Sequence, residues 1–256
     1  MYKVNSLNLM TGTDILIDNY SVKIHQPSMK EISIIGEERF FKSLNLFIVE
    51  YDDLKQNLID DLVTNNGDIG EEDLDTIKNF NDLDILLLLC RSDEETTRIL
   101  SDMFNLIFKD YKFEFLKTEL TMTITDTEGA IVTMDIDLFN NIKNIISQIF
   151  IFNKLFDKDK YNPANDRAKE IIKKLEKSKK KIEAQNDSPN KADSFFANLI
   201  SILGVTGQNV NEISNLTIYQ LYNQFERYNL YMQYNQSLQA AIAGAKVEII
   251  DWFTQI

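Results

Sequence analysis

Residues 219–234 read YQLYNQFERYNLYMQY, with six aromatic side chains, one at every third position. An α-helix turns by about 100° per residue, so a spacing of three moves each ring by about 60° around the helix axis. The rings therefore spread around most of the helix, and one flat neighbour covers only about half of them. The pattern predicts either a core helix of a small helical domain or a helix whose remaining rings contact another protein.

The aromatic stretch has the side chains of a contact surface. Tyrosine suits an interface because its ring is apolar while its hydroxyl tolerates water. Glu226 and Arg227 interrupt the rings with adjacent charges, and a buried charge that loses its partner costs ~3–5 kcal/mol. We expect Arg227 to lock an interface or a domain contact. The predicted partner interface consists of Tyr219, Tyr222, Phe225, Arg227, Tyr228, Tyr231, Tyr234 and Trp252.

The composition of the 256-residue chain favours helices. Glycine (8) and proline (3) are scarce, and the apolar fraction of 44% is that of a globular protein with one large domain or two small ones. The net charge of -13 argues against sequence-independent binding of nucleic acid, because phosphates are repelled. Apolar runs fall short of the roughly 20 residues that a bilayer requires, so we expect no membrane contact.

The first hundred residues predict a small hairpin followed by helices. Residues 1–27 read as extended, with alternating apolar side chains and a turn near Asp18. Ser28 and Glu31 have capping-box spacing, in which each side chain satisfies a free N–H group at a helix start, and Gly36 marks the helix end. The following helices are expected at 37–47, at 54–63, at 74–90, and from a second capping box, Ser92 with Glu95, to about 107.

Residues 112–136 change to a period of two. The turn at 126–129 predicts a β-hairpin, in which Gly129 adopts a positive φ. This hairpin is expected either to pair with the N-terminal strands or to cover helices. Asp137 then fits the cap of a long apolar helix over 138–156.

The second half of the chain predicts helices alone. A long polar helix is expected from Pro163, with eight basic residues between 167 and 181, followed by a linker at 184–191. An apolar helix ending at Gly204, the aromatic helix reaching about 243, and a short amphipathic helix with Trp252 complete the chain. The prediction is an α+β fold, predominantly helical, with a small antiparallel sheet in the N-terminal part and an all-helical C-terminal part. The expected domains are 1–160, the basic helix and linker 161–191, and a C-terminal module 192–256.

No pattern in the sequence has the residues of a catalytic or metal site. His25 is the only histidine and has no Ser or Cys nucleophile motif beside it, and Cys90 ends an apolar run as a small hydrophobic residue. The acidic loop 68–75 lacks the oxygen spacing of a calcium loop, and no Cys/His cluster could bind zinc. The pair Asp135 and Asp137 is explained by helix capping. We therefore expect no enzyme, no catalytic residue, no metal and no cofactor.

Three stretches resemble a group of proteins from tailed bacteriophages of low-GC Gram-positive bacteria. Residues 24–37 read IHQPSMKEISIIGE, residues 216–227 read LTIYQLYNQFER, and residues 240–246 read AAIAGAK ahead of Asp251-Trp252-Phe253. In such phages, proteins of this kind belong to the structural gene region, and tail assembly chaperone is among their suggested roles. The resemblance implies a non-enzymatic protein of virion or tail assembly, and it carries over no catalytic residue.

The implied partners are other phage structural proteins, in the tail tube, tape measure, baseplate or head–tail junction. A homo-oligomer is left open. The protein would then be located in the virion, in the host cytoplasm, or in both. The alternative is a nucleic-acid or regulatory adaptor that uses the basic helix 167–181.

Overall fold

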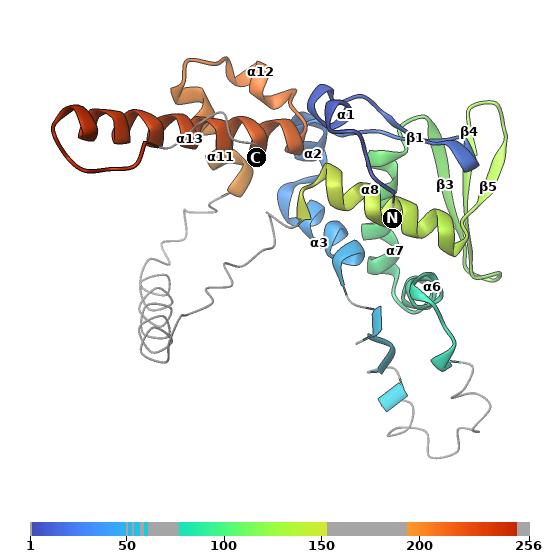
Figure 1. Ribbon diagram of the computed structural model, residues 1–256. Coiled ribbons are helices and arrows are strands. Elements are labelled where there is room, and N and C mark those ends of the chain that lie inside the picture. The colour runs from blue at the N-terminus through green and yellow to red at the C-terminus, as the bar shows by residue number, and fades with distance from the viewer. Residues whose placement is uncertain are drawn as a thin grey trace, which may run out of the picture.

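A computed structural model describes residues 2–49, 51–52, 54–56, 59–60, 77–152 and 194–249. Helices predominate, and two small antiparallel sheets accompany them, which confirms the predicted α+β fold. One sheet pairs β1 (Ile15–Ile17) with β2 (Val22–Ile24), and the other has the order β3 (Tyr111–Leu116), β4 (Thr121–Asp126), β5 (Ile131–Thr133). In Figure 1 the sheet of β3 to β5 lies at one end of the molecule and the C-terminal helices lie at the other.

The N-terminal hairpin is confirmed, and a 3-10 turn at Asp18–Tyr20 joins its strands. The extended interpretation of the residues before it is wrong, because α1 (Ser6–Thr11) is a helix. The side chain of Asn5 accepts a hydrogen bond from the backbone N–H of Leu7 at 2.9 Å and caps this helix. Only Leu9 of α1 is buried, so the helix shows no apolar repeat that periodicity could detect.

The first capping box is confirmed at the start of α2 (Met29–Ile35), where the side chains of Ser28 and Glu31 bond each other's backbone N–H groups. Gly36 ends the helix with a φ of 88°, a conformation that favours glycine. The next helix, α3 (Glu37–Ile48), matches the predicted bounds closely. It buries Phe40, Ser43, Leu44 and Phe47 in the core.

One further predicted helix is interrupted, and two begin at other caps than predicted. Within the helix expected at 74–90, residues 77–78 are helical and residues 79–81 are not, and α6 (Asp82–Ser92) starts anew at a capping box of Asn81 and Asp84. Asp93 caps α7 (Glu94–Ile107), and Ser92 instead ends α6. Asp135 caps α8 (Ile136–Ile149), while Asp137 lies in its first turn. The expected continuation of this helix to 156 is wrong at residues 150–151, which form a turn. For α7 and α8 a second good capping residue lies one or two positions from the true one, and the path of the preceding chain decides between them.

The sheet of β3 to β5 is a three-stranded meander, in which the predicted turn has Gly129 at a φ of 91°. Among the described strands it does not pair with the N-terminal hairpin, so the first expected arrangement is wrong. It covers helix α7 instead: the ring of Phe113 on β3 lies 4.5 Å from that of Phe104 on α7, centroid to centroid. Met122 and Ile124 on β4 are fully buried.

The C-terminal helices are α11 (Phe195–Val205), α12 (Val210–Ser214) and α13 (Ile218–Ile242). Gly204 lies within α11 and does not end it, and the short helix α12 was not predicted. Phe196 on α11 stacks on Phe41 at 5.4 Å and meets Phe40 edge-on at 5.9 Å, so the core is continuous from α3 to α11. Residues 245–249 are not helical, so the expected terminal helix does not include Val247, and the rest of that helix lies outside the described residues.

Several predictions lie outside the described residues. They concern most of the helix at 54–63, the acidic loop 68–75, the helix beyond residue 152, the basic helix 167–181, the linker 184–191, and Trp252. The division into domains at 160 and 191 therefore stays a prediction. No described helix combines the length and the apolar character that a membrane span requires.

Candidate protein interface on the C-terminal helix

The helix α13 starts at a third capping box, formed by Thr217 and Gln220. The N–H of Thr217 donates to Gln220 Oε1 at 2.9 Å, and the N–H of Gln220 donates to Thr217 Oγ1 at 3.3 Å. Two long-range bonds attach this start to the N-terminal part: Met29 N–H donates to the carbonyl of Leu216, and Gln220 Nε2 donates to the carbonyl of Met10, both at 2.9 Å. The first turn of α13 is therefore held rigidly against α1 and α2.

Most of α13 is not enclosed. In this fully described helix of 25 residues, only Ile218 and Leu221 are buried. Figure 1 shows that α11 and α12 accompany its first part, whereas its second part extends past them. A helix of this length normally gains its stability from a packed face, and the second part of α13 supplies little of one.

The structure divides the six predicted aromatic residues into two groups. The first four are half-buried and pack against the core: Tyr219, Tyr222, Phe225 and Tyr228. Tyr231 is 46% exposed and Tyr234 is half-buried, and neither belongs to that packed set among the described residues. The two alternatives from the sequence, core helix and contact helix, thus apply to successive parts of the same helix.

The charged pair of α13, Glu226 and Arg227, lies within the last turn of the packed part, just before Tyr228. Tyr222 is hydrogen-bonded to the carboxylate of Glu226 one turn later, and burial together with this negative charge raises the pKa of Tyr222. Arg227 is partly exposed, and its expected locking role stays a prediction. Trp252 lies outside the described residues, so the structure does not bring it to the site.

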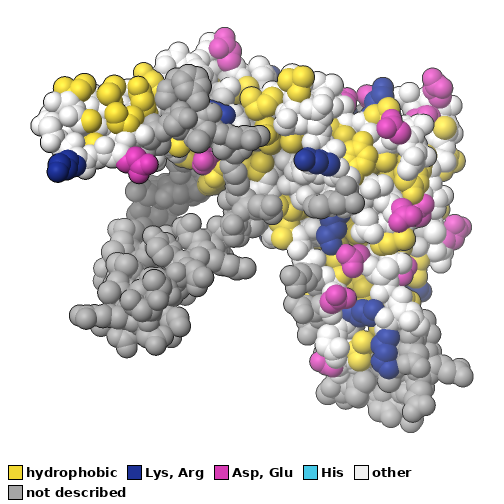
Figure 2. All heavy atoms as spheres, in the orientation of Figure 1, with side chains coloured by type: hydrophobic (Ala, Val, Ile, Leu, Met, Phe, Trp, Pro, Cys, Tyr) yellow, Lys and Arg dark blue, Asp and Glu magenta, His cyan; other side chains and the backbone are white. Residues whose placement is uncertain are grey.

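Apolar residues without a ring extend the exposed surface, and the aromatic spacing did not reveal them. Met232 is 39% exposed and Ile242 is 78% exposed, and Val247 and Ile249 follow in the last described segment. Figure 2 shows hydrophobic and uncharged side chains along this part of the molecule, with charged ones at its lower edge. Depletion of charge with enrichment of Tyr and Met is typical of the centre of a protein interface.

A polar hollow of about 440 Å³ lies where α1 and α2 meet the start of α13. His25 Nδ1 lies 2.9 Å from Asp14 Oδ1, and its Nε2 lies 3.3 Å from Glu31 Oε2. Burial raises the pKa of Glu31, but hydrogen bonds from Lys109, Ser28 and His25 outweigh it and lower the pKa to about 2. Because both ring nitrogens of His25 face carboxylates, neither is placed to activate a hydroxyl such as that of Ser28.

The sequence identified the capping box in this hollow but not the ionic cluster around it. Asp14 and Lys109 come from distant parts of the chain, and no local spacing pointed to them. The cluster joins the N-terminal hairpin and α2 to Lys109, which lies two residues after the end of α7. Its geometry is that of a structural junction.

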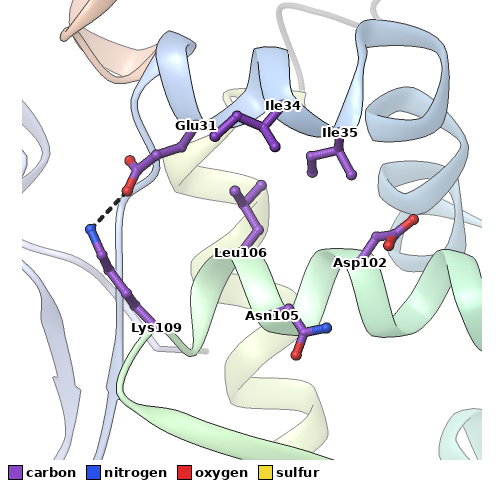
Figure 3. A pocket seen from close by; sticks show the side chains of 7 residues that line it. All are labelled: Glu31, Ile34, Ile35, Asp102, Asn105, Leu106 and Lys109. Atoms are coloured by element: carbon purple, nitrogen blue, oxygen red, sulfur yellow. Dashed lines mark hydrogen bonds and ion pairs between the residues drawn. The ribbon is translucent and has the colours of Figure 1, made fainter.

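A second, more apolar hollow of about 290 Å³ lies between α2 and α7 (Figure 3). Ile34, Ile35 and Leu106 converge on it, and Ile34 is 82% exposed. An ion pair closes each end: Lys109 Nζ lies 2.8 Å from Glu31 Oε1, and Arg39 Nη2 lies 2.6 Å from Asp102 Oδ2. The lining contains no Ser or Cys beside a base, and within the described ranges no three His, Cys, Asp or Glu side chains are grouped to hold a metal ion.

A comparison with protein families gives one match in the C-terminal part. The family model described as the YomV second domain matches residues 187–256, which include α11, α12 and α13. YomV is a family of phage-region proteins, so the match points to a phage origin for this chain. Neither the curated proteins nor the solved structures contain a match.

Proposed function

We propose that this is a non-enzymatic structural-module protein of a bacteriophage, which acts in virion or tail assembly through contacts made by α13. The observation that supports this best is the helix itself, which has 25 residues but buries only Ile218 and Leu221. A partner protein that covers its second part would supply the missing packed face.

The match to a phage-region family supports the phage setting, and the exposed helix supports a role in assembly. Two forms of the proposal differ in how long the contact lasts. A component of the tail, baseplate or head–tail junction keeps its partner permanently. A tail assembly chaperone covers tape-measure or tail-tube subunits and then leaves. The net charge of -13 favours solubility before assembly in either form.

Mass spectrometry of purified phage particles tests the proposal, with a tail-tube subunit of the same particles as the copy-number standard. A copy number that is a multiple of three or six, as expected from ring symmetry, identifies a built-in component. Absence from particles, with recovery in complexes with tail proteins from infected cells, identifies a chaperone. Absence from both particles and complexes would contradict the proposal.

The adaptor alternative rests on the eight basic residues at 167–181, which lie outside the described part of the chain. It predicts DNA binding whose affinity falls as the salt concentration rises. The dependence of the logarithm of affinity on the logarithm of salt concentration should become less steep after Lys179, Lys180 and Lys181 are replaced by Ala. A lack of binding at low salt would remove this alternative.

A further inference from the structure

One side of α13 carries exposed apolar and amide side chains in a regular order. At about 100° per residue, six residues fall within an arc of about 140°. We call them the outer face: Tyr231, Met232, Asn235, Gln236, Gln239 and Ile242. Tyr231, Met232 and Ile242 are 46%, 39% and 78% exposed, Gln236 and Gln239 are exposed, and Asn235 is half-buried.

The outer face bears no charge, although the chain contains 40 acidic and 27 basic residues. A basic partner would be recognised best by a face that contains some of the acidic residues, because interfaces match opposite potentials. A second copy of this chain has the same net charge of -13, and a neutral face lets two such copies meet without local repulsion between like charges. The missing charge therefore favours self-association over a basic partner.

The chemistry of the outer face is complementary to itself. An amide both donates and accepts hydrogen bonds, so Gln236 and Gln239 can bond the same residues of a copy, which a carboxylate or an ammonium group cannot do. The order along the helix is also symmetric: apolar at 231–232, amide at 235–236 and 239, apolar at 242. An antiparallel two-fold pairing sets Met232 against Ile242 and Gln236 against Gln239, each contact occurring twice.

We infer that the partner of the outer face is the outer face of a second copy, paired antiparallel about a two-fold axis near residue 237. In the antiparallel direction, the acidic N-terminal parts of the two copies lie at opposite ends of the paired helices. The 12 residues at 231–242 span about 18 Å, which exceeds the screening length of about 8 Å at physiological salt. A parallel pairing would place the two acidic N-terminal parts side by side, where their like charges repel. The inference rests on the proposed use of α13 as a contact surface.

Charge substitutions at the axis test the pairing on the full-length chain. Gln236→Lys and Gln236→Glu each repel their own copy, and both residues are good helix formers. We expect the wild type to sediment at twice the 29.7 kDa chain mass as concentration rises. Each variant alone should weaken association about a hundredfold or more, and an equal mixture of the two should restore the dimer. Gln208→Lys and Gln208→Glu, at an exposed amide between α11 and α12, are the matched controls and should dimerise like the wild type.

A wild type that remains at one chain mass overturns the inference and leaves the outer face to a different protein or to residues 250–256 of the same chain. Failure of the mixture to restore the dimer overturns it as well. Circular dichroism must show the same helix content in all variants. Mass spectrometry of the particles tests the proposed function separately. If the protein is found in particles but is a monomer in solution, only the pairing is contradicted. If it is a dimer but is absent from particles and tail complexes, only the proposed function is contradicted.

Discussion

Single residues of α13 differ in what they stabilise. Tyr222 and Phe225 pack against the core, so Tyr222→Ala and Phe225→Ala should mainly destabilise the fold. Phe225 is only half-buried, and we expect its loss to fall near or below the lower end of the ~3–5 kcal/mol typical of a buried Phe. Tyr231→Ala and Tyr234→Ala should change the free energy of unfolding by less than about 1 kcal/mol and weaken association instead. Urea denaturation and sedimentation equilibrium measure the two effects separately.

The conservative variant Tyr231→Phe is the control for this series, since it keeps the ring and removes only the hydroxyl. It should retain association, because the apolar ring supplies the contact, and urea denaturation then shows what the hydroxyl contributes to the free energy of unfolding. An equal loss of stability at all four alanine positions would mean that the whole of α13 is core, and the contact interpretation would then be wrong.

Glu31 makes stability depend on pH in an acidic window. Its folded-state pKa is lowered from the ordinary value of 4.5 to about 2, because hydrogen bonds from Lys109, Ser28 and His25 outweigh the opposing effect of burial. A lowered carboxyl pKa contributes stability that is present above pH 4.5 and is lost as pH falls toward 2. Because the side chain is partly exposed, we expect a contribution of about 1–2 kcal/mol, less than the full shift implies.

The measurement is the free energy of unfolding from pH 6 down to pH 2, in wild type and Glu31→Gln. The difference between the two should shrink as pH falls through the window. Lys109→Met removes the first of the stabilising partners and should lose part of the same pH dependence. Parallel pH profiles for wild type and Glu31→Gln would show that Glu31 titrates alike in the folded and unfolded chain.

At the scale of elements, Asn81 distinguishes the observed start of α6 from the predicted one. As the N-cap, Asn81 accepts a hydrogen bond from Asp84 N–H at 3.1 Å, and Asn81→Ala should cost about 1 kcal/mol. If the helix ran through this position, as the apolar pattern from residue 74 predicted, alanine would stabilise it by a few tenths of a kcal/mol. Thermal unfolding shows whether Asn81→Ala lowers or raises the stability of the protein. Asn140→Ala, at an exposed interior position of α8, is the matched control and should not destabilise.

Periodicity predicted the long helices and their buried faces, but not the ends or the short elements. The capping box of Ser28 and Glu31 was found because one spacing stood alone before an apolar repeat. The capping-box spacing of Ser92 and Glu95 pointed to Ser92, but the adjacent Asp93 is an equally good cap, and the sequence does not contain the angle at which α6 leads into α7. The helices α1 and α12 have too few residues to display a period.

The candidate interface was predictable as a helix but not as a surface. The spacing of three identified every aromatic residue of α13, yet which rings are covered depends on where α1 and α11 pack, and only the structure gives that. Met232 and Ile242 were missed because single apolar residues outside the aromatic spacing do not stand out in a sequence. Their exposure became informative only once the end of the packed region was known.

At the scale of the whole molecule, the C-terminal helices depend on the N-terminal part. Phe196 packs on Phe40 and Phe41, and Glu37 on α3 accepts hydrogen bonds from the hydroxyl of Ser194 and the N–H of Phe195. The start of α13 is bonded to the chain around α1 and α2. A family boundary near residue 187 therefore does not mark the edge of a separate core.

The predicted module 192–256 should consequently be largely unfolded as an isolated fragment, and the full chain should unfold in one transition because its core is continuous. The helices α11 to α13 bury six side chains: Phe196, Leu199, Leu203, Ile213, Ile218 and Leu221. Several of these face the N-terminal part, and domains below about 70–80 residues rarely gain more than ~3–5 kcal/mol from a core even when it is complete. Far-ultraviolet circular dichroism should show little helix in the fragment, and a gain of helix when residues 1–191 are added. A cooperative transition of the fragment alone, at the denaturant midpoint of the full chain, would show that the contacts to α1, α2 and α3 contribute nothing and that the module folds independently.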